Sequence, residues 1–285
     1  MHKEPILEDG NWGPRLLMRG TWTPSLGEQI DLASVRELIV DWNRGWRGRD
    51  LWFLQEFPDL EALRLRIPSL EDPSVLYTLE KLRSLHLATF CNSEIHFEKW
   101  PHLQECRLDW MPCAASILQQ GELQALRVDH FPGRDLSSMT SLRKLQRLQF
   151  HQPRLRSLAG AGVFAELEHL KILDGHRLRS LDGLQSLTRL QRLDINRCPR
   201  LKDLQALAEL TSLQVLHLTD NGKIPSLQPL ATLRELRELR FYDSTEVVDG
   251  DLRPLLALTK LEKLAFKPRD HYTHGWADFP QIGFQ

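Results

Sequence analysis

The sequence lacks several features that would assign it to a familiar compartment. It has only four cysteines in 285 residues, too few for a disulfide framework, which favours a reducing, intracellular setting. No stretch approaches the roughly 18 uninterrupted apolar residues of a membrane-spanning helix. The opening residues MHKEPILEDGNWGPRLL show no basic leader followed by an apolar run, so we expect no secretory signal. These absences predict a cytoplasmic protein with no membrane association.

An excess of charge of either sign is also missing. Lysine and arginine total 37 and aspartate and glutamate total 38, which gives a formal net charge of −1. This balance creates no polybasic field that would attract a phosphate backbone, and there is no acidic tail. The composition therefore argues against nucleic acid as the partner.

The motifs of common enzymes are absent, since GxxxxGK[ST], GxSxG and CxxC do not occur. One weak match remains, in which Gly160, Gly162 and Ala165 fit G-x-G-x-x-A and Asp182 lies 20 residues after Gly162. A dinucleotide site needs a strand before this motif and a long helix after it. The surrounding leucines belong instead to the repeat described below, so a loop is the better interpretation.

A second weak match is the pair His271 and His274, which forms H-x-x-H near the end of the sequence. A metal site needs three or four converging ligands, and no acidic or cysteine partner stands at a fixed spacing from this pair. An exposed histidine pair is the better interpretation. We expect no catalytic residues, no cofactor and no metal, and hence no enzyme.

What the sequence does contain is an internal repeat of about 22 residues, clearest in LTSLQVLHLTDN. One column of the repeat is an anchor residue, and further apolar columns lie two residues after it and three and six before it. In these four columns 43 of 44 positions are apolar, whereas a composition of 41% gives about 18. The anchors are Leu38, Leu63, Leu85, Cys106, Leu126, Leu148, Leu170, Leu193, Leu216, Leu239 and Leu264.

The pattern LxxLxxLxLxxN resembles the leucine-rich repeat, and its length is most similar to the short classes of internalins and phosphatase regulators. This resemblance implies an α/β fold: a right-handed solenoid, curved into a horseshoe or arc, with a concave parallel sheet and convex 3₁₀ turns or short helices. Physical chemistry supports this fold. An L-x-L segment makes a short strand with both leucines pointing inward, and stacking of neighbouring coils buries the apolar side chains that a single coil would leave exposed.

The expected organisation is a solenoid of about eleven coils over residues 32–268 between two caps. The N-terminal cap is residues 1–31, in which Leu16 and Met18 allow one degenerate repeat. The C-terminal cap is residues 269–285. Its aromatic side chains are Tyr272, Trp276, Phe279 and Phe284.

The asparagine that ends the repeat in this family ties down backbone amides at the turn. It is present here only as Asn43 and Asn221. We therefore expect coils 2 to 6 to be less regular than coils 8 to 10.

If the core uses the inward columns, a partner binds the outward side chains of the strands, directly after the anchor and two residues further on. Adjacent strands lie about 4.8 Å apart, so each column forms a ladder of side chains. The first ladder is mainly basic and the second contains carboxylates, and aromatic and arginine side chains are typical of interface hot spots. The candidate partner-binding residues are Asp41, Trp42, Arg64, Arg66, His86, Arg107, Asp109, Trp110, Arg127, Asp129, His151, Lys171, His217, Arg240 and Tyr242.

Two interpretations of this surface stay open: a recognition surface, or a solvated face whose opposite charges neutralise one another. The loop DWNRGWRGRD, residues 41–50, is similarly either cover for a cap or contact surface. We expect a non-catalytic module that binds a protein or peptide on its concave face, as an inhibitor, an immunity-type protein or a regulatory protein. The alternative is that the arginine ladder binds RNA or another polyanion. The sequence does not determine the oligomeric state.

Overall fold

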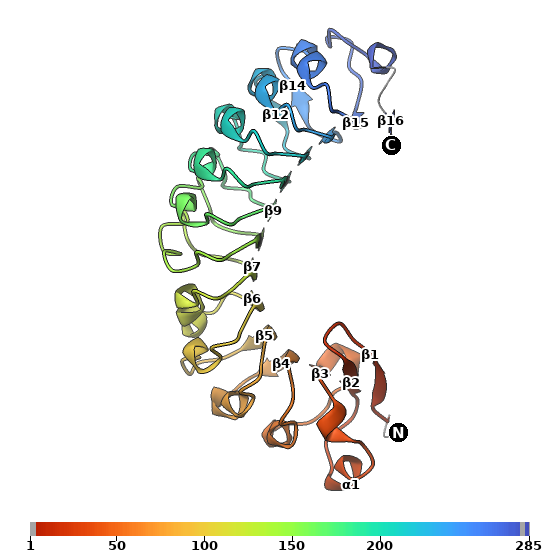
Figure 1. Cartoon of the computed structure of the whole chain (residues 1–285), viewed down its shortest axis with the longest axis vertical. Coiled ribbons are helices and arrows are strands. Elements are labelled where there is room, and N and C mark those ends of the chain that lie inside the picture. The colour runs from red at the N-terminus through yellow and green to blue at the C-terminus, as the bar shows by residue number, and fades with distance from the viewer. Residues whose placement is uncertain (1–3, 280–282, 285) are drawn as a thin grey trace. The chain divides into compact units, whose positions relative to one another are not determined.

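The computed structural model describes residues 4–279 and 283–284 and contains two compact units, Met1–Ala125 and Leu126–Gln285. In each unit the strands lie along one side and short 3₁₀ helices along the other (Figure 1). The described residues include a single α-helix, α1 (Pro24–Gly27). None of their helices is long and apolar enough to cross a membrane.

Unit 1 begins with an antiparallel hairpin and continues as parallel strands paired in chain order. The hairpin strand β2 pairs with β3 so that Leu16 lies opposite Leu38 and Met18 opposite Val40. Both side chains are buried, as a further coil of the repeat requires. The strands are β1 (Ile6–Asp9), β2 (Pro14–Met18), β3 (Glu37–Asp41), β4 (Ala62–Ser69), β5 (Ser84–Phe90) and β6 (Glu105–Asp109).

Unit 2 is a run of parallel strands in chain order, with a short second ladder of β12 and β14. Anchors pair with anchors, as Leu148 does with Leu170 and Leu193 with Leu216. The strands are β7 (Ala125–Asp129), β8 (Arg147–His151), β9 (His169–Leu173), β10 (Arg192–Asn196), β11 (Val215–Thr219), β12 (Lys223–Ile224), β13 (Glu238–Phe241), β14 (Glu246–Val247), β15 (Lys263–Phe266) and β16 (Gly283–Phe284).

The return half of most coils is a short 3₁₀ helix, as the three-residue spacing of its leucines favours. These helices are η1 (Leu32–Ser34), η2 (Trp42–Arg44), η3 (Trp52–Glu56), η4 (Pro73–Thr78), η5 (Phe97–Lys99), η6 (Pro112–Gln119), η7 (Ala161–Val163), η8 (Leu184–Ser186), η9 (Gln205–Glu209), η10 (Gln228–Thr232), η11 (Arg253–Ala257) and η12 (Trp276–Asp278).

The repeat columns form the hydrophobic core of each unit. Leu126, Leu148 and Leu170 are buried, and so is Cys106, whose thiol pKa is raised because burial disfavours the thiolate. Burying one such leucine side chain contributes about 1.5–3 kcal/mol relative to exposure. The one polar member of the four columns, Gln120, is also buried, and its amide donates a hydrogen bond to the carbonyl of Phe97. The core therefore accommodates the polar side chain of Gln120, because its amide is hydrogen-bonded.

The two asparagines of the repeat differ. Asn221 is fully buried, where its Oδ1 accepts from the Cys198 amide at 2.9 Å and its Nδ2 donates to the Ile195 carbonyl at 2.8 Å. Its own amide donates to Thr245 Oγ1 at 3.0 Å. Asn43 is exposed. The expected role in tying down backbone amides is thus found at Asn221.

The prediction that coils 2 to 6 are less regular is correct for coils 2 and 3 and wrong for coils 5 and 6. Strands β4 and β5 have eight and seven residues, and their register shifts between Arg66 and Ser69. Strands β7 and β8, of coils 5 and 6, have five residues each, the same length as β10 and β11. A missing asparagine alone does not disturb a coil, since Phe131 and Pro153 fill that column as buried side chains.

Candidate functional site

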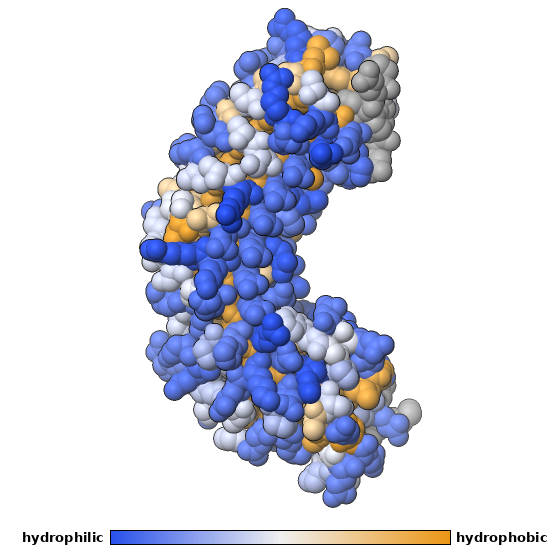
Figure 2. Space-filling model, viewed as in Figure 1, coloured by the Kyte–Doolittle hydropathy of each residue, from blue (hydrophilic) through white to orange (hydrophobic). Residues whose placement is uncertain are grey.

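We define the sheet face of each unit as the strand residues that point away from the core. They stand one residue before, one after and three after each anchor, because alternate residues of a strand point to opposite sides. The register confirms that like positions are neighbours: Arg64 lies opposite His86, and Lys171 opposite Asp194. In the view of Figure 2, hydrophilic residues predominate along the strand side of unit 2.

A continuous set of ion pairs crosses four strands of unit 2. Asp194 on β10 accepts from Arg192 Nε at 2.8 Å and from His217 Nδ1 at 2.7 Å. His217 on β11 also faces Glu238 Oε1 on β13, at 2.8 Å from Nε2. Glu238 in turn receives Arg240 Nε at 2.7 Å, with Lys263 Nζ of β15 at 3.8 Å. These side chains are held in fixed positions before any partner arrives.

Two carboxylates of this network remain ionised. Burial alone would raise the pKa of Asp194, but hydrogen bonds from His217 and Arg192 outweigh it and bring the pKa down to about 2. Burial would also raise the pKa of Glu238, but the hydrogen bond from His217 and the charge of Arg240 outweigh burial and lower the pKa. Both groups stay negative at neutral pH and keep the adjacent basic groups in place.

A second cluster in unit 2 surrounds Asp174, which follows β9. Asp174 Oδ2 lies 3.1 Å from His151 Nε2 and 3.0 Å from Arg197 Nη2. The hydrogen bond from Arg197 is the main reason that the pKa of Asp174 is lowered. Asp129 accepts from Arg127 Nε at 3.0 Å on the same strand. Asp129 therefore pairs with the basic residue two positions before it, Arg127.

In unit 1 the predicted contact residue Asp41 is only 1% exposed. Its carboxylate accepts from the Asn43 amide at 2.8 Å and lies 3.2 Å from Arg64 Nη2. Asp41 cannot reach a partner, so we revise its role to one of positioning Arg64.

A cavity of about 250 Å³ opens on the sheet face of unit 1, between the strands and the tip of the N-terminal hairpin. The hairpin tip is fixed there because the Trp12 amide donates to Glu37 Oε1 at 2.6 Å, and the Arg83 guanidinium stacks 4.8 Å from the Trp12 ring. Arg15 Nε donates to Glu37 Oε2 at 2.5 Å. Arg64 and His86, both candidate residues, line this cavity.

The sequence interpretation missed the column directly before the anchors, which supplies Glu37, Arg192 and Glu238 to these contacts. The signal was available, because strand alternation makes that column outward as well. It missed Trp12 on the sheet face for a different reason. Nothing in the local sequence says where a hairpin tip will dock.

The loop at residues 41–50 serves partly as cover for the core and partly as accessible surface. Trp46 is buried and packs with Phe53 at 5.2 Å between ring centroids, which is core cover. Trp42 is 45% exposed, with the Arg47 guanidinium 4.8 Å over its ring. Trp42 is accessible to a partner.

The remaining candidates are accessible to different degrees. Arg66 and Asp109 are exposed on unit 1, while Arg107, Trp110, Arg127, Lys171, Arg240 and Tyr242 are half-buried. Within the residues that the structure describes, Arg66, Lys171 and Tyr242 have no side-chain partner. These three side chains are thus available for new contacts.

The two weak motifs have local roles. Gly160 has a left-handed φ of +90°, and a Cβ there would come within 2.9 Å of the backbone of residues 136–137, so the turn requires glycine. The segment after it is the three-residue η7, too short for a dinucleotide site. His271 Nε2 bonds the Val247 carbonyl at 3.0 Å, and His274 Nδ1 bonds Thr273 Oγ1 at 2.8 Å. No group of three or more potential metal ligands occurs among residues 4–279.

Comparison with solved structures places this architecture among leucine-rich repeat proteins. An internalin, InlF from Listeria monocytogenes, superposes with a TM-score of 0.61 at 16% identity over 90% of this chain and 87% of that one. A leucine-rich repeat protein of Leptospira interrogans gives 0.61 at 16% over 93% and 81%. The structure of a TLR13–ssRNA13 complex gives 0.66 at 17%, over 88% of this chain and 39% of that one.

No protein-family model matches the sequence, and no curated protein matches it. The chain has the leucine-rich repeat fold, a parallel-sheet solenoid with 3₁₀ turns, which confirms both the resemblance and the fold class read from the repeat.

Proposed function

We propose that this protein is a non-catalytic binding module that holds a protein or peptide partner against its sheet face. The role covers an inhibitor, an immunity-type protein or a regulatory protein. Leucine-rich repeat neighbours support an interaction module in general terms. The choice of the sheet face comes from its own chemistry.

The observation that carries the proposal is the ion-pair network of Asp194, His217 and Glu238. Each of these side chains is fixed by at least two partners within 2.8 Å. A surface that is already ordered loses little side-chain entropy on docking, so more of the contact energy appears as affinity. Fixed alternating charges also select a complementary partner over others.

Three further side chains are accessible: Lys171 and Tyr242 on unit 2, which carries this network, and Arg66 on unit 1. Arginine and tyrosine are typical anchors of protein interfaces. Because these three side chains make no hydrogen bond or ion pair within the described residues, their replacement removes no polar interaction that holds the fold.

The test uses the intact chain as bait, with the captured protein identified and then titrated against variants. We expect Lys171→Glu with Tyr242→Ala to weaken binding at least about tenfold, which is about 1.4 kcal/mol. The control is Arg189→Glu, the same charge reversal at an exposed position outside the strands of the sheet face. Equal affinity of all three proteins for the partner would exclude the sheet face as the site.

A second candidate is binding of RNA or another polyanion on the same surface. It is favoured by the basic residues Lys171, Arg192, Arg240 and Lys263 on unit 2, and one similar structure is a complex with single-stranded RNA. The interleaved Asp194 and Glu238 argue against it. Binding to phosphates weakens steeply with salt, so oligo(U) affinity that falls by about 10³-fold or more between 50 and 200 mM salt would support this candidate. A salt-independent partner would exclude it.

We also propose that residues 1–31 and 269–285 cap the solenoid, and that the protein is cytoplasmic. Burial of Leu16 and Met18 supports the first cap, and the rings of Tyr272 and Phe279 near Phe266 support the second. Removal of residues 269–279 should expose Phe266 and increase binding of a hydrophobic dye. A fluorescent fusion that accumulated outside the cytoplasm would contradict the location.

A further inference from the structure

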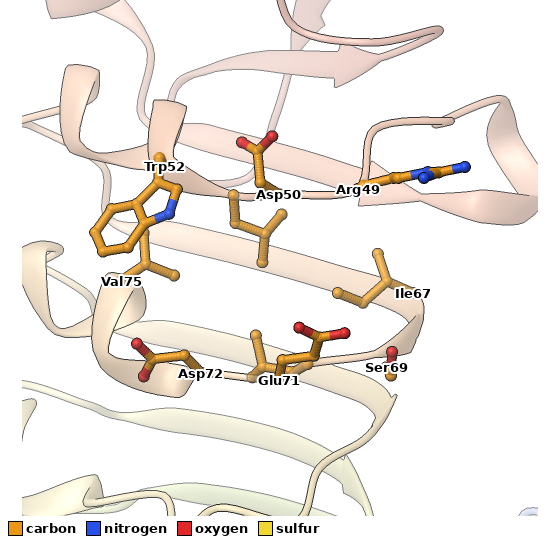
Figure 3. Close-up of a pocket in the computed structure, with 10 residues that line it drawn as sticks. Arg49, Asp50, Trp52, Ile67, Ser69, Glu71, Asp72 and Val75 are labelled. Atoms are coloured by element: carbon orange, nitrogen blue, oxygen red, sulfur yellow. The ribbon is translucent and has the colours of Figure 1, made fainter.

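Unit 1 has a second cavity, of about 160 Å³, away from the cavity of the sheet face. Figure 3 shows its lining, which comes from the segment before η3, from the end of β4 and from the start of η4. We call it the Trp52 cavity, after the large side chain at one edge. None of its lining residues belongs to the candidate sheet-face set.

The cavity exists because this part of the solenoid is irregular. The anchors Leu38 and Leu63 are 25 residues apart, and β4 runs on to Ser69 with a register shift after Arg66. The extra residues of adjacent coils cannot stack on one another, so they leave a depression where regular coils would be in contact.

The floor of the cavity is apolar. Leu51, Leu70 and Val75 line it and are each less than about a tenth exposed. Trp52 is 57% exposed, an unusual exposure for so large an apolar ring. This combination suits the aliphatic part of a long side chain, which can lie on the floor against the indole.

The rim is negative. Asp50, Glu71 and Asp72 line the cavity together with one basic residue, Arg49. Figure 3 shows Asp50 and Glu71 at opposite edges, with the guanidinium of Arg49 extended away from both. Asp72 is occupied, since its carboxylate accepts from the Ser74 amide at 2.8 Å and from its hydroxyl at 2.7 Å.

The carboxylates of Asp50 and Glu71 make no ion pair or hydrogen bond within the described residues. They therefore have their full capacity to accept hydrogen bonds from a cation. A cation in this cavity is attracted both by the quadrupole of the Trp52 ring and by the two carboxylates.

We propose that the Trp52 cavity receives a lysine or arginine side chain of a partner protein. The stem of the side chain lies on Leu51, Leu70 and Val75, and its cationic head lies between Asp50 and Glu71. A neighbouring cavity of about 530 Å³ on unit 1 shares Arg49, Asp50 and Trp52 as lining residues. It provides room for the residues that flank the basic side chain. The site is separate from the sheet face and does not depend on it.

The test is an NMR titration of the ¹⁵N-labelled full chain with acetyl-Gly-Lys-Gly-amide and acetyl-Gly-Arg-Gly-amide. The indole N–H signal of Trp52 is assigned through Trp52→Phe. We expect a saturable shift of this signal, with a dissociation constant on the order of 1 mM. The matched probe acetyl-Gly-norleucine-Gly-amide, which keeps the stem and lacks the charge, should bind at least about tenfold more weakly.

Two variants with the same change of net charge separate the rim from a general field effect. Asp50→Asn with Glu71→Gln should weaken the lysine peptide about tenfold, whereas Glu80→Gln with Glu94→Gln, at exposed positions outside the cavity, should not. Lys171→Glu with Tyr242→Ala should leave this binding unchanged, so failure at one surface is distinguishable from failure at the other. No shift of the Trp52 signal, equal binding of the norleucine peptide, or indifference to the rim variant would each overturn the proposal.

Discussion

The two units solve the same problem, the turn after each strand, in different ways. In unit 2 the fourth residue after the anchor has a left-handed backbone in six successive coils, at His130, Gln152, Asp174, Arg197, Asp220 and Asp243. The amide of each of the first five donates to a carbonyl of the next coil, as Gln152 does to Leu173 at 2.8 Å. In the described part of unit 1, left-handed residues are glycines only.

The difference follows from which side chains occupy that column. Unit 1 has Trp42, Ile67, Thr89 and Trp110 there, and aromatic and β-branched residues rarely adopt the left-handed region. Aspartate, frequent in unit 2, adopts it more readily. Two of the four strands that lack the left-handed turn, β4 and β5, continue for eight and seven residues with a register shift between them, whereas β3 and β6 end after five.

The comparison teaches that a regular turn stabilises the solenoid, whereas an irregular coil leaves cavities. The left-handed turn adds one backbone hydrogen bond per coil and keeps neighbouring coils in contact. Where it is missing, unit 1 has cavities of about 160, 250 and 530 Å³. Unit 2 has an ordered charged surface, and unit 1 has cavities.

The largest expected effect is at the buried asparagine of unit 2. Asn221→Ala leaves the Cys198 amide and the Ile195 carbonyl without partners, and we expect a loss of about 3 kcal/mol in the free energy of unfolding. Urea unfolding followed by circular dichroism measures it. Asn43→Ala, at the same column of unit 1 but exposed, should change stability by less than about 0.5 kcal/mol. Equal losses would show that the two turns do not differ as described.

A smaller effect is expected at Asp194, whose pKa is about 2 in the folded protein and about 3.9 in an unfolded chain. A lowered folded pKa stabilises the protein above the unfolded pKa, and this stabilisation is lost as pH falls from about 4 to 2. Asp194→Asn should therefore cost about 1–2 kcal/mol at pH 7, and the gap from wild type should close toward pH 2. Unfolding midpoints measured across this pH range test it.

The matched change in unit 1 is Asp59→Asn. Hydrogen bonding to Lys81 lowers the pKa of Asp59, but the pair lies at the surface, where water screens it. Its effect should be the smaller of the two. A larger effect at Asp59 would mean that the network of unit 2 adds no order to its surface.

The smallest pair of effects concerns the turn column itself. Asp243→Gly should stabilise the protein by about 0.5 kcal/mol, because glycine adopts its φ of 61° without strain. Thr89→Gly should destabilise by about 0.5–1 kcal/mol, because Thr89 lies within the extended strand β5. Differential scanning calorimetry compares the two midpoints. Shifts of the same sign would contradict the assignment of the left-handed turn to unit 2 alone.

Much of the fold could be predicted because the same pattern of apolar residues recurs in every coil. The anchor column fixed which side chains are buried, and the alternation about it placed Arg64 beside His86 and Lys171 beside Asp194. The site was predicted less completely. Asp41 is in an outward column and is nevertheless buried, since the turn at Asn43 folds back over it.

The side chains of the Trp52 cavity were beyond prediction for a related reason. Asp50 and Glu71 belong to different coils in segments outside the repeat pattern, so no spacing rule brings them together. Nothing in the sequence distinguishes the exposed Trp42 and Trp52 from the buried Trp46.

The sequence by itself determined the coil, its buried columns and the order of its strands, because each of these depends on contacts between positions that recur at a constant spacing. Tertiary structure alone decided where Trp12 docks, that Asp41 is covered and that a cavity opens beside Trp52. These outcomes depend on differences in length and conformation between the irregular segments of neighbouring coils. That mismatch is a property of the packed backbone, and no single coil contains it.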